Sequence, residues 1–347
     1  MDKYVESLVE EVRARAIRIA PDLLKTLYLG GGTPSLLGPA GIANLLRQFG
    51  TESGVGDLST VLWKNTEVTL EANPEDVSAA AVRAWRMAGV NRVSLGVQSF
   101  DSRVLAWMHR GHDAEGTAEA MRVLRGEGIE DLSVDLIAGV PEAMGRDWER
   151  DLELALALEP THLSVYSLTV EPHTPLGRWA ARGEVCEAPE ERHAAEFLRA
   201  HDRLTGAGFE HYEVSNYSRP SRRARHNSAY WTRVPYLGLG PSAHGFDGEV
   251  RRWNLSAYAA WSGAVGHDPV GGSERLGPAE RAAEEVYLGL RTADGLSVHQ
   301  NDITTVTSWM NQGWAVLEPA GRLRLTPEGW LRLDALAAAL TSARSRS

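Results

Sequence analysis

The chain has 347 residues, of which 43% are hydrophobic and 24% charged, and its formal net charge at pH 7 is −10. This length suits a large globular body with a smaller second domain, and the net acidity argues against a general nucleic-acid binder. The single cysteine, Cys186, excludes an intramolecular disulfide framework. No apolar run approaches the ~20 residues of a membrane span, and the charged N-terminal residues are not those of a secretory signal. We therefore expect a cytoplasmic protein with no transmembrane segment and no nucleic-acid partner.

Strand-like and helix-like stretches alternate through the first half of the chain. An amphipathic helix is predicted over 3–19, and a Gly- and Ser-rich loop over 51–65. Five apolar runs bounded by breakers predict strands, and they lie at 27–29, 67–73, 91–98, 131–138 and 162–168. Helices of about 10–15 residues between strands indicate right-handed βαβ units, and hence a parallel sheet in a barrel or a doubly wound fold.

Polar residues at corresponding strand positions favour the barrel. They fall at or just past the predicted C-terminal strand ends and comprise Gly31–Thr33, Glu71, Asn73, Gln98, Asp135, Tyr166, Thr169 and Glu171. A parallel barrel gathers these positions on the face where barrel active sites lie. The fold class that we predict is therefore α/β.

The glycine run Gly30–Gly32 follows the first of these strands. Glycines allow close backbone approach and positive φ, and their N–H groups can form a nest for an anion or carbonyl together with the Thr33 hydroxyl. The alternative is a plain glycine-rich turn.

The second half of the chain changes character twice. A long helix over 190–204, a strand over 211–215 and a polar loop over 216–225 come first. The later elements are helices over 278–290 and 302–312, two short strands and a last helix over 327–342, an arrangement that resembles a winged helix and that we interpret as a packing domain. We place the domain boundaries at 1–185, 186–272 and 273–347. None of the eleven histidines has recognised metal-ligand spacing, so no metal site is predicted.

Several separate motifs agree in order and spacing with one known family. They are Gly30-Gly-Gly-Thr-Pro-Ser35, Glu71-Ala-Asn-Pro74, Ser94-Leu-Gly-Val-Gln-Ser-Phe100, Arg110-Gly-His112, Val134-Asp-Leu-Ile-Ala-Gly-Val-Pro141, Tyr212-Glu-Val-Ser-Asn216 and His226-Asn-Ser-Ala-Tyr-Trp231. In this order they resemble the oxygen-independent coproporphyrinogen III oxidase-like branch of the radical SAM superfamily, and within it the heme-chaperone group. The resemblance covers essentially the whole chain and implies a partial (β/α) barrel with a small C-terminal winged-helix-like domain.

The resemblance implies a site for S-adenosylmethionine (SAM). Gly31, Gly32 and Thr33 would receive the methionine amino end. The rest of the site would be lined by Glu71, Gln98, Arg110 and Asp135, with Asp135 suited to ribose hydroxyls and Arg110 to the carboxylate. The alternative is that Glu71 and Arg110 form a plain ion pair.

The family's Cys-x-x-x-Cys-x-x-Cys loop, whose thiolates hold a [4Fe–4S] cluster, has no counterpart in this sequence. Cys186 is the only cysteine, and one residue cannot supply three thiolates. Residue 1 already corresponds to the helix that follows this loop, so we expect a partial barrel without its first strand. A shortened N-terminus is the favoured explanation and a degenerate relative the alternative. Accordingly, no catalytic residue is assigned to this chain.

His226-Asn-Ser-Ala-Tyr-Trp231 resembles the HNxxYW signature of the heme chaperones. An imidazole can ligate heme iron, and the aromatic rings of Tyr230 and Trp231 can lie along a porphyrin face. The arginines just upstream, which could meet the propionates, are Arg222, Arg223 and Arg225. The alternatives are a solvated basic loop and an ordinary aromatic pair in the core.

Two functions of different classes follow from the resemblance. In the first, the chain binds heme through His226 and transfers it to an unidentified acceptor protein. In the second, it is an oxygen-independent coproporphyrinogen III oxidase of porphyrin biosynthesis, which would require the missing cluster. A cofactor-free barrel whose pocket is a relic is the third possibility.

Overall fold

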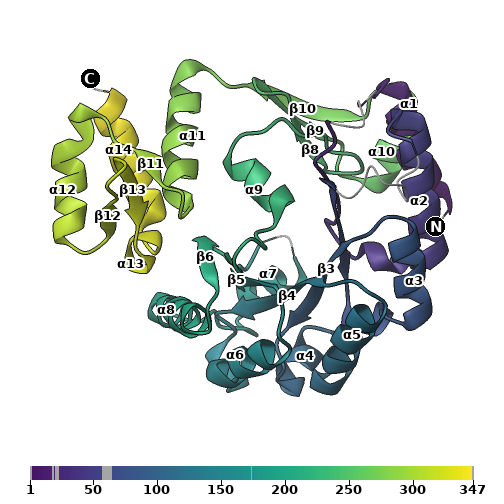
Figure 1. Cartoon of the computed structure of the whole chain (residues 1–347), viewed down its shortest axis with the longest axis horizontal. Helices are drawn as coiled ribbons and strands as arrows, with labels where there is room; N and C mark the ends of the chain where they lie inside the picture. The colour runs from purple at the N-terminus through teal and green to yellow at the C-terminus, as the bar shows by residue number, and fades with distance from the viewer. Residues whose placement is uncertain (1, 18, 20–22, 57–64, 173, 346–347) are drawn as a thin grey trace. The chain divides into compact units, whose positions relative to one another are not determined.

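The computed structural model describes residues 2–17, 19, 23–56, 65–172 and 174–345. Its main sheet has seven strands in the order β1-β2-β3-β4-β5-β7-β6. Figure 1 labels β3 to β6 of this sheet. The strands are β1 (Thr26–Leu29), β2 (Glu67–Ala72), β3 (Arg92–Gln98), β4 (Asp131–Ala138), β5 (His162–Ser167), β6 (Glu210–Glu213) and β7 (Asn216–Ser218). β1 pairs with β2, and β4 with β5, in parallel. The first five strands confirm the five predicted ones; β2 to β5 are largely buried, whereas in β1 only Leu29 is buried.

The chain divides into two compact units. The first unit comprises residues 1–71, 78–93 and 225–284, and the second comprises 72–77, 94–224 and 285–347.

In the first unit, three helices accompany β1 and β2. They are α1 (Asp2–Ala14), α2 (Gly38–Ser53) and α3 (Ala79–Met87). α1 buries the apolar positions that the helical period predicts, including Val5, Val9 and Val12. It ends earlier than the predicted helix, since Ala16 takes a left-handed φ of 47°. The predicted loop over 51–65 begins inside α2, and its central part, residues 57–64, lies outside the described residues.

The remainder of the first unit is an antiparallel layer that the sequence did not reveal. It contains α9 (Arg225–Trp231), β8 (His244–Phe246), β9 (Val250–Asn254), α10 (Tyr258–Ala264) and β10 (Val270–Arg275), with the strands in the order β10-β9-β8. β9 and β10 are largely half-buried or exposed, so they lack the apolar runs by which the other strands were recognised.

In its described residues, the second unit contains five α-helices besides its C-terminal part, and aspartate side chains cap three of them. These helices are α4 (Ser102–Trp107), α5 (Ala114–Gly126), α6 (Trp148–Ala157), α7 (Pro175–Ala181) and α8 (Glu190–Gly206). Asp101, Asp113 and Asp147 each accept a backbone N–H in the first turn of α4, α5 and α6. β7 lies between β5 and β6 and pairs antiparallel with both, although its residues fall in the predicted polar loop over 216–225.

The C-terminal part shows the predicted succession of two helices, a β-ribbon and a helical end. Its elements are α11 (Pro278–Arg291), β11 (Leu296–Ser297), α12 (Ile303–Asn311), β12 (Ala315–Leu317), β13 (Arg322–Leu325), α13 (Pro327–Trp330) and α14 (Leu333–Ser345). β13 is the central strand of the small sheet. Leu290, Leu323, Trp330 and Leu340 are among the residues of its apolar core. Within the described part of the chain, no helix combines the length and the hydropathy needed to cross a membrane.

Candidate functional site

The glycine loop, residues 30–33, connects β1 to a short 3₁₀ helix, η1 (Pro34–Leu37). Gly31 has a φ of 84°, which L side chains rarely adopt. The backbone N–H of Gly31 donates to Oε2 of Glu71 at 3.2 Å. The loop therefore presents an amide to a carboxylate, as the nest interpretation requires, but that carboxylate belongs to the chain itself.

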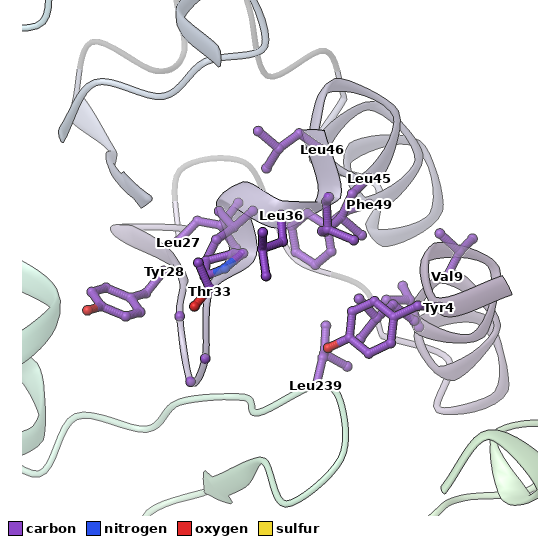
Figure 2. Close-up of a pocket in the computed structure, with 18 residues that line it drawn as sticks. Tyr4, Val9, Leu27, Tyr28, Thr33, Leu36, Leu45, Leu46, Phe49 and Leu239 are labelled. Carbon is purple, nitrogen blue, oxygen red and sulfur yellow. The ribbon is translucent and has the colours of Figure 1, made fainter. Parts of the chain in front are cut away.

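Next to the glycine loop lies a cavity of about 300 Å³. Figure 2 shows its aliphatic and aromatic lining from α1, β1 and α2, with Thr33 in the adjoining loop. Val9, Leu45 and Phe49 are among these side chains. This lining suits apolar atoms and offers little to a zwitterion.

Glu71 is held by Tyr28 as well as by the glycine loop. The Tyr28 hydroxyl donates to Oε1 of Glu71 at 2.5 Å. Tyr28 is 38% exposed, because alternation along β1 turns it away from the buried Leu29. Figure 2 shows its ring extending away from Leu45 and Phe49. The sequence prediction included Glu71 and missed Tyr28. The alternation of side chains along a strand would have indicated that Tyr28 lies on the face opposite to that of Leu29.

Gln98 and Arg110 lie near Asn73 in the second unit. Nη1 of Arg110 donates to Oδ1 of Asn73 at 2.9 Å. Gln98, the last residue of β3, has a φ of 67°, a conformation that costs a non-glycine residue of order 1 kcal/mol and is common at functional sites. A methyl group on Gly96 would lie 3.0 Å from Nε2 of Gln98 and 3.5 Å from Oδ1 of Asn73, so the glycine leaves room for both side chains.

His112 of the Arg-Gly-His motif connects two neighbouring chain segments of the second unit. Its Nδ1 lies 2.9 Å from Oε2 of Glu75, and its Nε2 lies 3.1 Å from the carbonyl oxygen of Val97. Burial alone would raise the pKa of Glu75, but hydrogen bonds from its own backbone and from His112 lower it. His112 is therefore a tether between chain segments in the second unit.

Asp135 lies within β4, three residues before its end, rather than at the strand end that the sequence predicted. Its carboxylate accepts hydrogen bonds from the hydroxyl of Ser94 at 2.9 and 3.0 Å and from that of Ser133 at 3.2 Å. Oγ of Ser133 also lies 2.8 Å from Nδ1 of His162, whose Nε2 lies 2.8 Å from the Tyr212 hydroxyl.

A carboxylate only accepts, which gives this chain of hydrogen bonds a direction. Ser133 donates to Asp135, Nδ1 of His162 donates to Ser133, and the Tyr212 hydroxyl donates to His162. The buried His162 and Tyr212 thereby fix the orientation of Asp135. Sequence reasoning did not single out either residue for this role, because they lie on other strands.

His226 sits near the start of α9 and has partners at both ring nitrogens. Nδ1 lies 2.8 Å from Oγ1 of Thr26, and Nε2 lies 2.9 Å from the hydroxyl of Tyr230. The carboxylate of Glu67 accepts the backbone N–H groups of Arg225 and His226, each at 2.8 Å. Burial lowers the pKa of His226 to about 4, so the imidazole is neutral at pH 7.

Aromatic rings continue on both sides of His226. We call Tyr28, His226, Tyr230 and Tyr236 the aromatic row. Neighbouring ring centroids lie 4.9, 5.1 and 4.7 Å apart in this order. Tyr28 and Tyr230 are 38% and 37% exposed, so the row is half-open to solvent. The sequence named His226 and Tyr230 and missed the other two, which lie outside the HNxxYW segment.

The remaining parts of the predicted heme segment have internal partners or an unmet donor. Arg223 pairs with Glu210 and Asp294, and Nη1 of Arg225 donates to the carbonyl oxygen of Asn65. Nδ2 of Asn227 is buried and has no acceptor among the described residues. A buried amide donor without a partner costs about 1–3 kcal/mol, so this atom favours a ligand that accepts from it.

The residues of this chain do not fit a [4Fe–4S] cluster. Its single cysteine, Cys186, is exposed. Among the described ranges, no group of three or more His, Cys, Asp or Glu side chains has a metal-binding arrangement. We therefore derive no chemistry through a cluster from this chain.

Comparison with known proteins shows the family to which the chain belongs. Residues 1–155 match the family model described as "Radical SAM superfamily". The chain is 35% identical over 327 residues to the "Heme chaperone HemW" of Synechocystis sp., which covers 90% of this chain and 77% of the relative. It is 33% identical over 384 residues to the bovine "Radical S-adenosyl methionine domain-containing protein 1, mitochondrial", covering 98% of this chain and 83% of the relative.

Among solved structures, coproporphyrinogen III oxidase (HemN) from Escherichia coli superimposes with a TM-score of 0.76 at 20% identity, covering 98% of this chain and 83% of that one. This likeness confirms the predicted partial (β/α) barrel. The family model and the bovine relative together show that the chain is a protein of the radical SAM superfamily. Within it, the chain belongs to the family of the heme chaperone HemW.

Proposed function

We propose that this chain is a cytoplasmic heme chaperone, which binds heme through His226 and transfers it to an acceptor protein. The observation that carries the proposal is a neutral imidazole in the middle of a half-exposed row of aromatic rings. The relatives named heme chaperones support it, because they match most of the chain at 31–37% identity.

The residue chemistry fits the ligand. Heme supplies an iron that accepts an imidazole nitrogen and a flat face that stacks on aromatic rings. Low proton affinity leaves the lone pair of His226 available at neutral pH. Tyr230 is the half-exposed partner of Nε2, and rotation of its side chain opens that nitrogen to a ligand. Asn227 supplies a donor for an acceptor group on the ligand.

Hemin titration followed by absorbance tests this proposal. We expect a saturable Soret shift for the unaltered chain and at least tenfold weaker binding for His226→Ala. The exposed His267→Ala is the matched control and should bind as the unaltered chain does. Tyr230→Phe removes the hydroxyl that occupies Nε2 and should tighten binding. Equal affinity of the His226→Ala variant and the unaltered chain would overturn the assignment.

We also propose that the residues predicted for S-adenosylmethionine bind parts of that molecule. In the first unit, Gly31, Gly32, Thr33 and Glu71 would take its ammonium group. In the second unit, Gln98, Arg110 and Asp135 offer an amide, a cation and an oriented carboxylate for the methionine carboxylate and the ribose hydroxyls.

Ligand-observed NMR with L-methionine and with adenosine tests the two sets separately. Glu71→Gln should abolish the methionine signal, and Asp135→Asn the adenosine signal. Retention of both signals in both variants would remove these residues from the proposal.

Oxygen-independent coproporphyrinogen III oxidation is not proposed for this chain. That activity needs a [4Fe–4S] cluster, and one cysteine does not supply its thiolates.

A further inference from the structure

One side chain of the aromatic row contacts both the predicted heme ligand and the predicted SAM residue. The Tyr28 ring stacks on the His226 imidazole, with centroids 4.9 Å apart and planes at 16°. Its hydroxyl donates to Oε1 of Glu71 at 2.5 Å. The other oxygen of Glu71 accepts the N–H of Gly31 at 3.2 Å. All of these residues belong to the first unit.

The backbone beneath Tyr28 is shaped for this arrangement. A Cβ on Gly30 would overlap Cε1 of Tyr28 and Oε1 of Glu71, so only glycine allows the phenol to cross the loop and reach the carboxylate. The glycine loop, Glu71, Tyr28 and His226 therefore form one contiguous set of contacts.

Glu71 cannot change partners without affecting Tyr28. An ammonium group bound to Glu71 shares the carboxylate with the Tyr28 hydroxyl and the Gly31 amide and neutralises its charge. The hydrogen bond that holds the phenol, and with it the ring parallel to His226, is then weaker, because it loses the assistance of that charge.

The ring also matters electronically for iron binding. A phenol that donates to a carboxylate has a more electron-rich π face. An imidazole bound to iron(III) becomes electron-poor, and an electron-rich face stabilises it as such a face stabilises a cation. Hence the Tyr28–Glu71 bond strengthens iron binding at His226, and its loss weakens it.

We propose that Tyr28 is a positioning residue that couples Glu71 and the glycine loop to His226, so that a cation bound at Glu71 promotes release of heme. This inference rests on the proposed heme ligand, His226. Linkage is reciprocal, so heme bound at His226 weakens cation binding at Glu71 by the same factor.

A double-mutant cycle on the full chain, with hemin as the probe, tests the coupling. Tyr28→Phe keeps the stacked ring and removes the hydroxyl, whereas Glu71→Gln removes the charge. Each variant should raise the hemin Kd about threefold to tenfold, the range for the net contribution of one ordinary hydrogen bond. The double variant should be no weaker than the worse single one, and all should keep the Soret position of the unaltered chain.

Two further variants separate positioning from folding. Tyr28→Leu removes the ring, so it should weaken hemin binding more than Tyr28→Phe does and change the Soret position. Tyr258→Phe, a half-exposed tyrosine of the same unit, is the control and should leave the hemin Kd unchanged. Additive effects in the cycle, or an unchanged Kd in both single variants, would overturn the coupling.

Amide hydrogen exchange measures the coupling between Glu71 and the His226 segment in the absence of heme. Glu71→Gln should speed exchange in peptides covering 26–36 and 222–233 when Tyr28 is present, but only in 26–36 when residue 28 is Phe. Failure of His226→Ala to weaken hemin binding would refute the proposed function alone. Absence of any response in 222–233 to Glu71→Gln would refute the coupling, whatever heme does.

Discussion

The carboxylate of Glu67, the first residue of β2, accepts the backbone N–H of His226 at 2.8 Å across 159 residues of sequence. Its other oxygen accepts the N–H of Arg225 at the same distance. Glu67 thereby satisfies two of the amides left open at the start of α9 and places its negative charge at the positive end of the helix. The predicted heme ligand is thus held by the sheet rather than by its own short helix.

Replacement of Glu67 by alanine should loosen α9. Loss of comparable N-terminal caps costs about 1–2 kcal/mol, which corresponds to a factor of about 5–30 in an equilibrium constant. We expect the hemin Kd of Glu67→Ala to rise within this range and that of Glu67→Gln, which keeps one acceptor oxygen, to rise less. The exposed Glu6→Ala is the control for the loss of a carboxylate. Unchanged hemin binding in Glu67→Ala would show that α9 needs no cap.

A methyl group at Gly30 should disturb the site without removing any functional group. It would overlap Tyr28 and Glu71, so the phenol must move, and the unfolding free energy should fall by about 1–3 kcal/mol. Hemin binding should weaken with it. In Gly263→Ala, within α10, the added methyl group meets no heavy atom within 4 Å, so this variant should be neutral or slightly stabilising. Urea unfolding compares the two, and equal stabilities would contradict the predicted overlap.

Strands and helices of the barrel were predictable because their signals are local. β2 to β5 are largely buried strands and β1 is a short apolar run that ends in the buried Leu29, so all five could be predicted directly from the sequence. β9 could not be predicted in this way, since Arg251 and Arg252 interrupt its apolar pattern. It pairs with β10 in a small sheet whose residues are mostly half-buried or exposed. β7 was hidden for a related reason. Asn216 and Ser218 are polar, and only pairing with β5 and β6 makes them strand residues.

The candidate site shows the same limit more sharply. The sequence motifs were enough to identify the chemically important side chains, Glu71, Asp135 and His226. Their supporting residues were not identified in this way, because Tyr28, Glu67 and His162 act through contacts with residues 29 to 198 positions away. A side chain that works by holding another has no signature of its own until the fold brings the two together.

Glu11 is a buried carboxylate whose loss should strongly destabilise the first unit. Its oxygens accept from Nη1 of Arg15 at 2.9 Å, the N–H of Gly240 at 2.9 Å, Nδ2 of Asn254 at 2.7 Å and Nε1 of Trp261 at 3.0 Å. Glu11→Ala leaves these donors without their acceptor and a buried arginine without its counter-charge, so we expect a loss of about 3–5 kcal/mol in unfolding free energy.

Glu10→Ala, one residue earlier, is the control for this loss. Glu10 is half-exposed and its ion-pair partner among the described residues is the exposed Arg13, so its removal should cost less than about 1 kcal/mol. Equal losses in urea unfolding would show that the buried contacts of Glu11 contribute nothing beyond those of a surface carboxylate.

His211 should make the protein less stable in mild acid. Burial lowers its pKa from 6.5 to about 3, although a hydrogen bond to the carbonyl of Val214 opposes the shift and the nearby His201 adds to it. Nε2–H donates to that carbonyl, so Nδ1 accepts from Nδ1–H of His201 at 2.9 Å. The Tyr217 ring stacks on the His211 ring with centroids 3.9 Å apart, and the Trp330 ring packs edge-on against it with centroids 4.4 Å apart. A proton on Nδ1 of His211 would point at Nδ1–H of His201, which is itself a donor, and the charge would be buried among aromatic rings.

The sign follows from the direction of that shift. Between pH 6.5 and about 3 the unfolded chain binds a proton at His211 that the folded chain excludes, so stability is complete above pH 6.5 and is lost as the pH falls. At pH 5 the loss is about 2 kcal/mol. Urea unfolding at pH 7 and pH 5 should therefore show a smaller drop for His211→Gln than for the unaltered chain, by about this amount. His267→Gln, which alters an exposed ring, should keep the full drop. A drop of the same size in all three proteins would mean that His211 is protonated in the fold.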